Sequence, residues 1–157
     1  SVRAWGRAIY GQQGTGNTGD ISRTFPARVA FPPGTPRIVS VNCVWDDTFF
    51  IDAEGGLWHA GGNSGYGSPT ASANAVPRRV NGVGQLPANA VVKQLITGHD
   101  WYGYRMLACL DAQGRVYVWG NNQQGSLGLG HTSAVTSPQL VPSRRCFCRA
   151  APMPPAT

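Results

Sequence analysis

The chain has 157 residues, a formal net charge of +6, 21 glycines and 12 prolines. This length suffices for one ordinary domain, and so much glycine and proline opposes long helices. No apolar run reaches the 18 residues of a membrane-spanning helix, and no signal-peptide apolar core follows the N-terminus.

The first expected unit covers residues 1–35 and opens with VRAWG at residues 2–6, which predicts a strand. A glycine-rich loop follows it. The stretch Gly14–Gly19 matches the dinucleotide-binding pattern GxGxxG, but no helix pattern follows in Asp20–Pro26. We therefore interpret these glycines as part of a repeat loop. The unit closes on Pro-x-x-Val at Pro26–Val29.

The second expected unit, residues 36–87, contains the sequence DAEGGLWHAGGN at residues 52–63. A strand at Thr48–Ile51, a turn at Asp52–Gly55 and a strand at Leu57–Ala60 form a predicted hairpin. Both runs are apolar at successive positions, which predicts strands covered on both faces. This unit closes at Pro77–Val80.

The third expected unit, residues 88–142, repeats that sequence as DAQGRVYVWGNN, 59 residues after the first copy. It predicts a second hairpin from Leu107–Leu110, Asp111–Gly114 and Val116–Trp119, and it closes at Pro138–Val141. Its loop glycines lie at the same distances from Gly120 as those of the first unit from Gly6. Such spacing marks backbone positions with positive φ or close approach.

A repeat with this period indicates units that cannot bury their apolar faces alone, and such arrays usually present binding surfaces. The positions that we assign to the repeat framework are Trp5, Gly6, Gly11, Gly14, Gly16, Asp52, Gly55, Trp58, Gly61, Asn63, Asp111, Gly114, Trp119, Gly120, Asn122, Gly125, Gly128 and Gly130.

These motifs together resemble the regulator of chromosome condensation repeat family over roughly residues 2–142. The matching elements are the Asp-x-x-Gly turn, the Trp-Gly-x-Asn segment at Trp119–Asn122, the Gly-x-x-Gly-x-Gly loop and the closing Pro-x-x-Val. The resemblance implies four-stranded propeller blades, seven in a typical member, and protein binding through loops at the blade rims. Some members act in nucleotide exchange or bind chromatin, but no residue here carries those activities over.

Two departures from the family pattern indicate a divergent member. Asp47 and Met106 stand where members usually carry a histidine before the hairpin turn. The loop of the second unit is also shortened, to Asn63–Gly67.

We therefore predict an all-β fold, a partial β-propeller built from repeats of about 55–60 residues with little helix. A seven-bladed ring would need more than twice this length, so the chain predicts a piece of a ring, an open array or one subunit of a composite propeller. Its terminal faces are expected to be covered by other chains or other parts of the same polypeptide. Residues 143–157 lose the repeat pattern and are expected to form an extended or disordered tail.

The candidate contact residues are Trp101, Tyr102, Tyr104 and Arg105, joined by Arg144 and Arg145 near the C-terminus. Aromatic side chains beside arginine on a loop are typical of interface hot spots. Trp101 and Tyr102 have no aromatic counterpart in the preceding unit, whereas Tyr104 aligns with Trp45 and is expected to pack between blades. Core or edge cover is the alternative role for all of these aromatic residues.

We expect no metal, cofactor or catalytic site. Cys43 and Cys109 are interpreted as buried small apolar residues. Cys146 and Cys148 are too close for an easy disulfide and lack the further ligands of a zinc site, so pairing with another chain stays open. The three histidines, His59, His99 and His131, show no paired spacing with Asp, Ser or Cys, and the adjacent acids Asp46 and Asp47 are expected to face a rim or cap a turn.

The sequence favours a non-enzymatic protein-binding or scaffold module. The alternative is a structural or adhesion component of a larger assembly, such as a phage virion or bacterial surface structure. Scattered arginines favour a solubilising surface over a nucleic-acid interface. The preference for arginine over lysine, with abundant alanine, indicates a GC-rich bacterial or phage genome, which leaves the bacterial cytoplasm and a virion or surface assembly open as locations. The expected partners are proteins, including other copies of the chain or neighbouring subunits.

Overall fold

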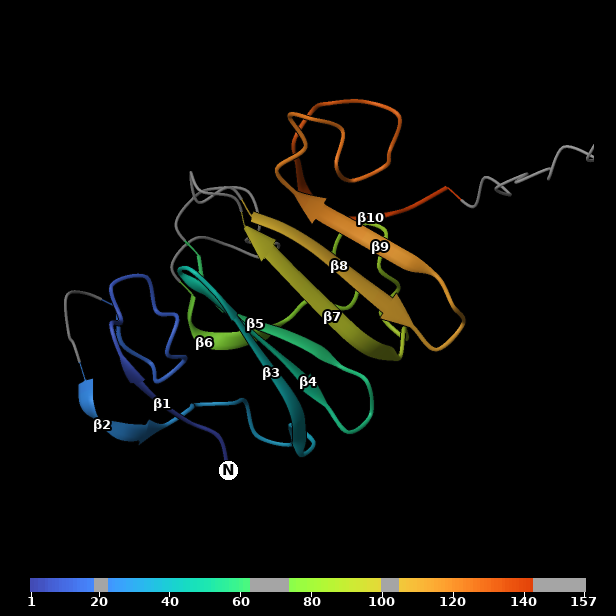
Figure 1. Cartoon of the computed structure of the whole chain (residues 1–157). Coiled ribbons are helices and arrows are strands. Elements are labelled where there is room, and N and C mark those ends of the chain that lie inside the picture. The colour runs from blue at the N-terminus through green and yellow to red at the C-terminus, as the bar shows by residue number, and fades with distance from the viewer. Residues whose placement is uncertain (19–22, 63–73, 100–104, 143–157) are drawn as a thin grey trace, which may run out of the picture.

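The computed structural model describes residues 1–18, 23–62, 74–99 and 105–142. These residues form β-strands in three antiparallel sheets (Figure 1). The strands are β1 (Arg3–Gly6), β2 (Arg23–Arg28), β3 (Ile38–Val44), β4 (Asp47–Asp52), β5 (Leu57–Gly61), β6 (Asn74–Arg79), β7 (Val92–His99), β8 (Arg105–Asp111), β9 (Val116–Gly120) and β10 (Val135–Leu140).

Each sheet is a meander in chain order and lies within one of the three expected units. Strands β1 and β2 form a two-stranded sheet, here called the half-blade. Strands β3 to β6 form blade 1, and β7 to β10 form blade 2. The predicted all-β fold is confirmed, and among the described residues no helix has the length and apolarity that a membrane crossing requires.

The two predicted hairpins are confirmed, and an aspartate organises each in the same way. The Asp52 carboxylate accepts backbone hydrogen bonds from Glu54 at 2.9 Å and Gly56 at 2.8 Å. Asp111 accepts the equivalent bonds from Gln113 and Arg115, both at 2.9 Å. In each copy the carboxylate replaces the backbone partners that a tight turn leaves unsatisfied.

The second carboxylate oxygen of each aspartate takes a different donor. Asp52 accepts from the indole of Trp58 at 2.8 Å, and Asp111 accepts from Nε of Arg115 at 2.7 Å. Burial alone would raise the pKa of Asp111, but the hydrogen bonds from Arg115 and Gln113 and the charge of Arg115 lower it below 3.8.

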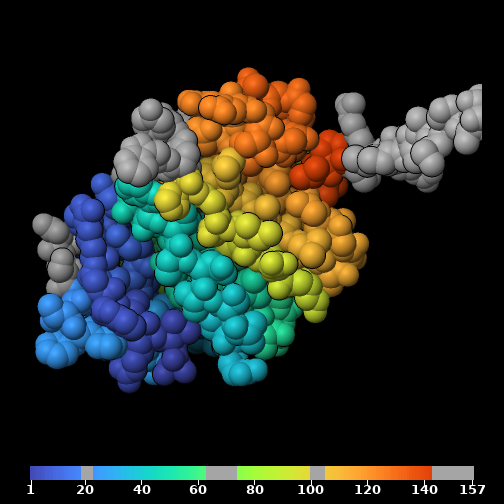
Figure 2. All heavy atoms as spheres, in the orientation of Figure 1, coloured from blue at the N-terminus to red at the C-terminus, as the bar shows by residue number. Residues whose placement is uncertain are grey.

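Blade 1 lies between the half-blade and blade 2, and Figure 2 shows the three units side by side. Successive side chains of a strand point to opposite faces, so β4 directs Phe49 towards blade 2 and Phe50 towards the half-blade. Both are buried, as are all other residues of β4 and β5. The predicted burial of these two strands on both faces is confirmed.

The predicted burial of Cys43 is wrong, because its side chain is exposed. Cys43 shares one face of β3 with Val39 and Val41, which are 53% and 48% exposed. The two-stranded half-blade leaves this face uncovered. Cys109 is buried as expected, and burial, with the nearby charge of Asp111, raises the pKa of its thiol to about 12.

Candidate interaction rim

The blades have two different edges. One edge, here called the hairpin rim, carries the turns between β4 and β5 and between β8 and β9 (Figure 1). The opposite edge, here called the loop rim, carries the β3–β4 turn, the end of β7 and the long glycine loops. Loops positioned by a rigid scaffold are where binding residues concentrate, so the loop rim is the candidate site.

Trp45 is a large exposed aromatic side chain on the loop rim, at 58%. Val44 of β3 pairs with Asp47 of β4, so Trp45 and Asp46 form the two-residue turn of this hairpin. The φ of Trp45 is +51°, and among the described residues other than glycine no further positive φ occurs. Glycine is the ordinary residue at such a position, and a bulky side chain there costs about 1–2 kcal/mol.

His99 extends the aromatic surface from blade 1 to blade 2. It is the last residue of β7 and lies on the surface. Its ring meets that of Trp45 edge to face, with centroids 6.2 Å apart at 84°. The two rings therefore form one patch, here called the aromatic patch, across the boundary between the blades.

A buried ionic cluster of Asp47, His59 and Arg105 lies in the same region, close in sequence to the patch. Asp47 Oδ1 is 2.7 Å from Nε2 of His59, and its Oδ2 accepts a hydrogen bond from Arg105. The side chains of Asp47 and His59 are 0% exposed, and that of Arg105 is 8% exposed. Because Arg105 belongs to blade 2 and the other two to blade 1, the cluster ties the two blades together.

Backbone contacts at Asp46, just before β4, and at Arg105, the first residue of β8, repeat between the blades. The carbonyl of Asp46 accepts a hydrogen bond from Gly62 at 2.8 Å, and that of Arg105 accepts one from Asn121 at 2.7 Å. A Cβ on Gly61 or Gly120 would overlap the carbonyl oxygen of Asp46 or Arg105 respectively. This close approach explains both framework glycines and fixes the loop rim against the sheets.

Asn122 organises the last glycine loop. Its amide donates to the carbonyls of His131 at 2.8 Å and Ser133 at 3.1 Å, and its oxygen accepts from Leu127 at 3.0 Å. It is completely buried.

The structure places Arg105 away from the surface on which the sequence put it. Its guanidinium is engaged with Asp47, so its position is that of a framework residue. Trp101, Tyr102, Tyr104, Arg144, Arg145 and the framework residue Asn63 lie outside the described residues. Sequence reasoning missed Trp45 and His99 as surface residues and the pairing of Asp47 with His59. Only the alignment of Trp45 with Tyr104 offered a signal.

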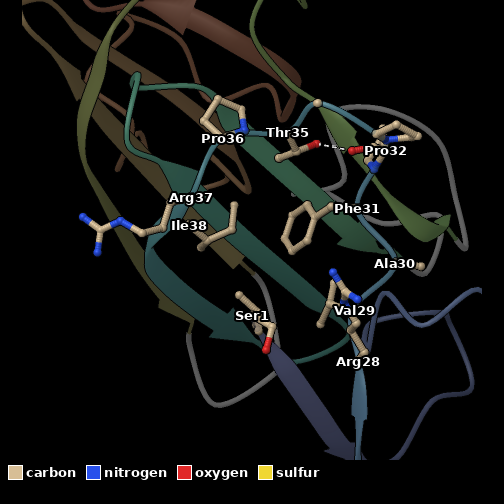
Figure 3. Close-up of a pocket in the computed structure, with 13 residues that line it drawn as sticks. Ser1, Arg28, Val29, Ala30, Phe31, Pro32, Thr35, Pro36, Arg37 and Ile38 are labelled. Atoms are coloured by element: carbon tan, nitrogen blue, oxygen red, sulfur yellow. Dashed lines mark hydrogen bonds between the residues drawn. The ribbon is translucent and has the colours of Figure 1, made fainter.

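A pocket of about 580 Å³ opens between the N-terminus and the segment from Arg28 to Ile38 (Figure 3). The hydroxyl of Thr35 donates a hydrogen bond of 2.7 Å to the carbonyl of Pro32, and the side chain of Arg37 extends away from Phe31. The side chains of Thr35 and Arg37 thus do not converge on one point, as the polar groups of a ligand site do. Among the described residues there is also no cluster of three His, Cys, Asp or Glu side chains that could hold a metal ion.

Four-stranded antiparallel blades packed face to face, with repeated Asp-x-x-Gly hairpins and glycine loops, define a partial β-propeller built from repeats. The family model described as the regulator of chromosome condensation (RCC1) repeat matches residues 1–51 and 113–151, more than half of the chain. The chain belongs to this family, as its motifs indicated.

Two known proteins are similar to the chain over most of its length. It is 29% identical over 141 residues to the ultraviolet-B receptor UVR8 of Arabidopsis thaliana, covering 87% of the chain and 29% of that protein. It is 27% identical over 143 residues to the human E3 ubiquitin-protein ligase HERC2, covering 90% of the chain and 3% of that protein.

Two solved structures show the same fold. Prp20p of Saccharomyces cerevisiae superposes with a TM-score of 0.69 at 20% identity, covering 88% of the chain and 33% of Prp20p. Human WBSCR16 gives a TM-score of 0.63 at 23% identity, covering 87% of the chain and 34% of WBSCR16. The chain thus spans about a third or less of the length of these relatives.

Proposed function

We propose that this chain is a non-enzymatic protein-binding module and that the aromatic patch of Trp45 and His99 contacts the partner. The observation that carries the proposal is the conformation of Trp45. A tryptophan at positive φ in a tight turn, with more than half of its surface exposed, contributes little to folding. Tryptophan is also enriched among the residues that dominate binding energies.

The surroundings of the patch support this role. The cluster of Asp47, His59 and Arg105 holds the two blades in one arrangement beside the patch, so the contact surface is presented without a large ordering cost. The charged side chains of this cluster, and those of Asp111 and Arg115, pair with one another within the fold. This pairing favours a binding role over acid–base chemistry.

The relatives supply the class of partner. Prp20p has binding properties towards Gsp1p and histones, and Kap60 is bound to it in another structure. Nucleotide-exchange or chromatin-type binding by this chain is the finer alternative. Purified Gsp1p, histones and Kap60 therefore form the first panel for direct binding measurements by biolayer interferometry.

A selection from a random peptide display library against the immobilised chain tests the proposed surface without knowledge of the natural partner. We expect enriched peptides to lose at least ten-fold in affinity for Trp45→Ala and to bind Glu54→Ala unchanged. Glu54 is the matched control because it is exposed on the hairpin rim. Peptides that bind both variants as tightly as the original chain would refute the rim as the binding surface.

The alternative of a structural component of a larger assembly rests on a different observation. Both ends of the blade array carry exposed apolar side chains, including Trp5 at 64% and Ile96 at 59%. These faces suit contacts between like subunits.

A further inference from the structure

Each blade has a forward face, turned towards the next blade along the chain, and a rear face. On blade 1 the forward face is covered by blade 2, and Ile51 and Leu57 are 3% and 0% exposed. The same positions of blade 2, 59 residues later, are Leu110 and Val116, at 36% and 38%. Together with Ile96, Leu110 and Val116 form an apolar forward face on blade 2. The described residues cover this face less than blade 2 covers the forward face of blade 1.

The hairpin glycines show the same difference in space. A Cβ on Gly55 would lie 2.6 Å from Cγ1 of Val91 and 2.9 Å from the backbone nitrogen of Val92. Val92, the first residue of blade 2, also donates a hydrogen bond of 2.9 Å to the carbonyl of Gly55. Gly114 has a φ of +76°, similar to the +83° of Gly55. A Cβ added to Gly114, however, would have no heavy atom of the described residues within 4 Å.

The loop glycines repeat the comparison at a third place. A Cβ on Gly11 would lie 2.7 Å from backbone atoms of Asn74 and Ala75 in β6, and Gly16 donates a hydrogen bond of 2.8 Å to Ala75. The counterpart of Gly11 in blade 2 is Gly125, with φ +70°, and it faces open space among the described residues. The forward end of blade 2 is therefore shaped to receive the outermost strand of another blade.

The rear face of the half-blade carries the complementary feature. Trp5 and Trp119 each stand directly before the first loop glycine of their unit. Trp119 is 0% exposed and packs on Phe49 of the forward face of blade 1, with ring centroids 6.1 Å apart. Trp5 is 64% exposed. Trp5 lies on the rear face of the half-blade, and no forward face of the described blades packs against it.

We propose that the forward face of blade 2 binds the rear face of the half-blade of a second copy of this chain, head to tail. In this contact β2 of the second copy lies along the loop of Gly125 as β6 lies along that of Gly11. Trp5 takes the place that Trp119 takes on blade 1. The contact thus continues, between copies, the interface that already exists between blades 1 and 2.

The open forward face of blade 2 is apolar at the positions where the forward face of blade 1 is charged. In blade 2 the positions equivalent to Asp47 and His59 are occupied by Met106 and Val118. Because these side chains carry no charge, a blade that packs on this face does not need a charged residue in the role that Arg105 has opposite Asp47. A head-to-tail contact joins two different surfaces and leaves one of each free at the ends, so it propagates unless a rotation closes it. This proposal does not depend on the aromatic patch.

Sedimentation velocity of the purified full chain over a micromolar concentration range tests the proposal. We expect the average mass to rise with concentration for the original chain. Val116→Arg on the forward face and Trp5→Glu on the rear face should each remain monomeric. Val76→Arg is the matched control, because Val76 is 39% exposed on blade 1, away from both open faces, and should associate like the original chain.

Mixing the two blocked variants separates head-to-tail association from other kinds. Val116→Arg keeps its rear face and Trp5→Glu keeps its forward face, so an equimolar mixture should form heterodimers and no larger species. Circular dichroism melts verify that both variants fold. A monomeric original chain, association that survives either substitution, or a mixture that stays monomeric would overturn the proposal. Trp45→Ala should associate normally, so failure of the rim proposal is seen separately.

Discussion

At the scale of single residues, Trp45 separates binding from stability. Replacing it with glycine removes the cost of about 1–2 kcal/mol for a side chain at positive φ. It also removes the ring contact with His99, worth about 0.5–1.5 kcal/mol. We therefore expect Trp45→Gly to leave the free energy of unfolding unchanged or raise it slightly, while binding of rim ligands is lost. A large drop in the urea midpoint would identify Trp45 as a folding residue instead.

The two described cysteines are expected to differ in reactivity. Cys43 is exposed, whereas Cys109 is buried with its thiol pKa raised to about 12, and thiolate is the reactive form. In a background with Cys146→Ser and Cys148→Ser, iodoacetamide at pH 8 should alkylate Cys43 within minutes and Cys109 only after unfolding. Mass mapping of the peptides measures both rates, and equal rates would contradict the packing of β8.

Asp111 should contribute to the acid side of the stability profile. Its folded pKa lies below 3.8, so the unfolded chain binds the proton first as the pH falls. The stabilisation is complete above the ordinary pKa and is lost as the pH drops through the folded one. Thermal unfolding midpoints at pH 3 and pH 7 should therefore differ less for Asp111→Asn than for the original chain. Glu54→Gln, an exposed carboxylate on the same rim, should leave the difference unchanged.

At the scale of elements, the paired hairpins allow a matched comparison. Gly55→Ala and Gly114→Ala share the cost of a positive φ, but only the first places a methyl group against backbone of the next strand. Gly55→Ala should lower the free energy of unfolding by about 1–3 kcal/mol more than Gly114→Ala. Urea unfolding in a Trp5→Glu background removes any effect of association. Equal losses would mean that the β6–β7 connection yields easily at Val91.

The elements that the sequence predicted are those set by local chemistry. Both Asp-x-x-Gly hairpins form because one carboxylate satisfies adjacent backbone donors, a pattern contained within five residues. The glycine spacing was equally informative, since positive φ excludes most side chains. Element-level repetition therefore gave the fold and the order of the blades.

What the sequence could not predict depends on contacts across blades. Asp47 and Arg105 are 58 residues apart and break the repeat, because Asp47 aligns with Met106 and Arg105 with Asp46. No periodicity reveals such a pair. The exposure of Cys43 and Trp5 likewise depends on which strands pack against them. The residue pattern of a single strand does not show which strands these are.

At the scale of the whole molecule, the buried cluster of Asp47, His59 and Arg105 links blade 1 to blade 2. Removing one member leaves a buried charge without its partner, which typically costs about 3–5 kcal/mol. Asp47→Ala and Arg105→Ala should each show a loss of this size in urea unfolding. Their effects should be strongly non-additive, because both break the same interaction.

Replacing the whole cluster with apolar residues tests whether charge is needed to join the blades. The repeat itself suggests the choice, since blade 2 carries Met and Val at the positions of Asp47 and His59. The triple variant Asp47→Met, His59→Val, Arg105→Met leaves no unpaired charge of this cluster, so it should be more stable than either single alanine variant. A triple variant as unstable as the sum of the single losses would show that the ionic cluster supplies net binding energy between the blades. If the triple variant is more stable than the single alanine variants, the cluster determines which blade binds to blade 1 and does not supply the binding energy. Without the cluster, the forward face of blade 1 would be apolar, like the open forward face of blade 2.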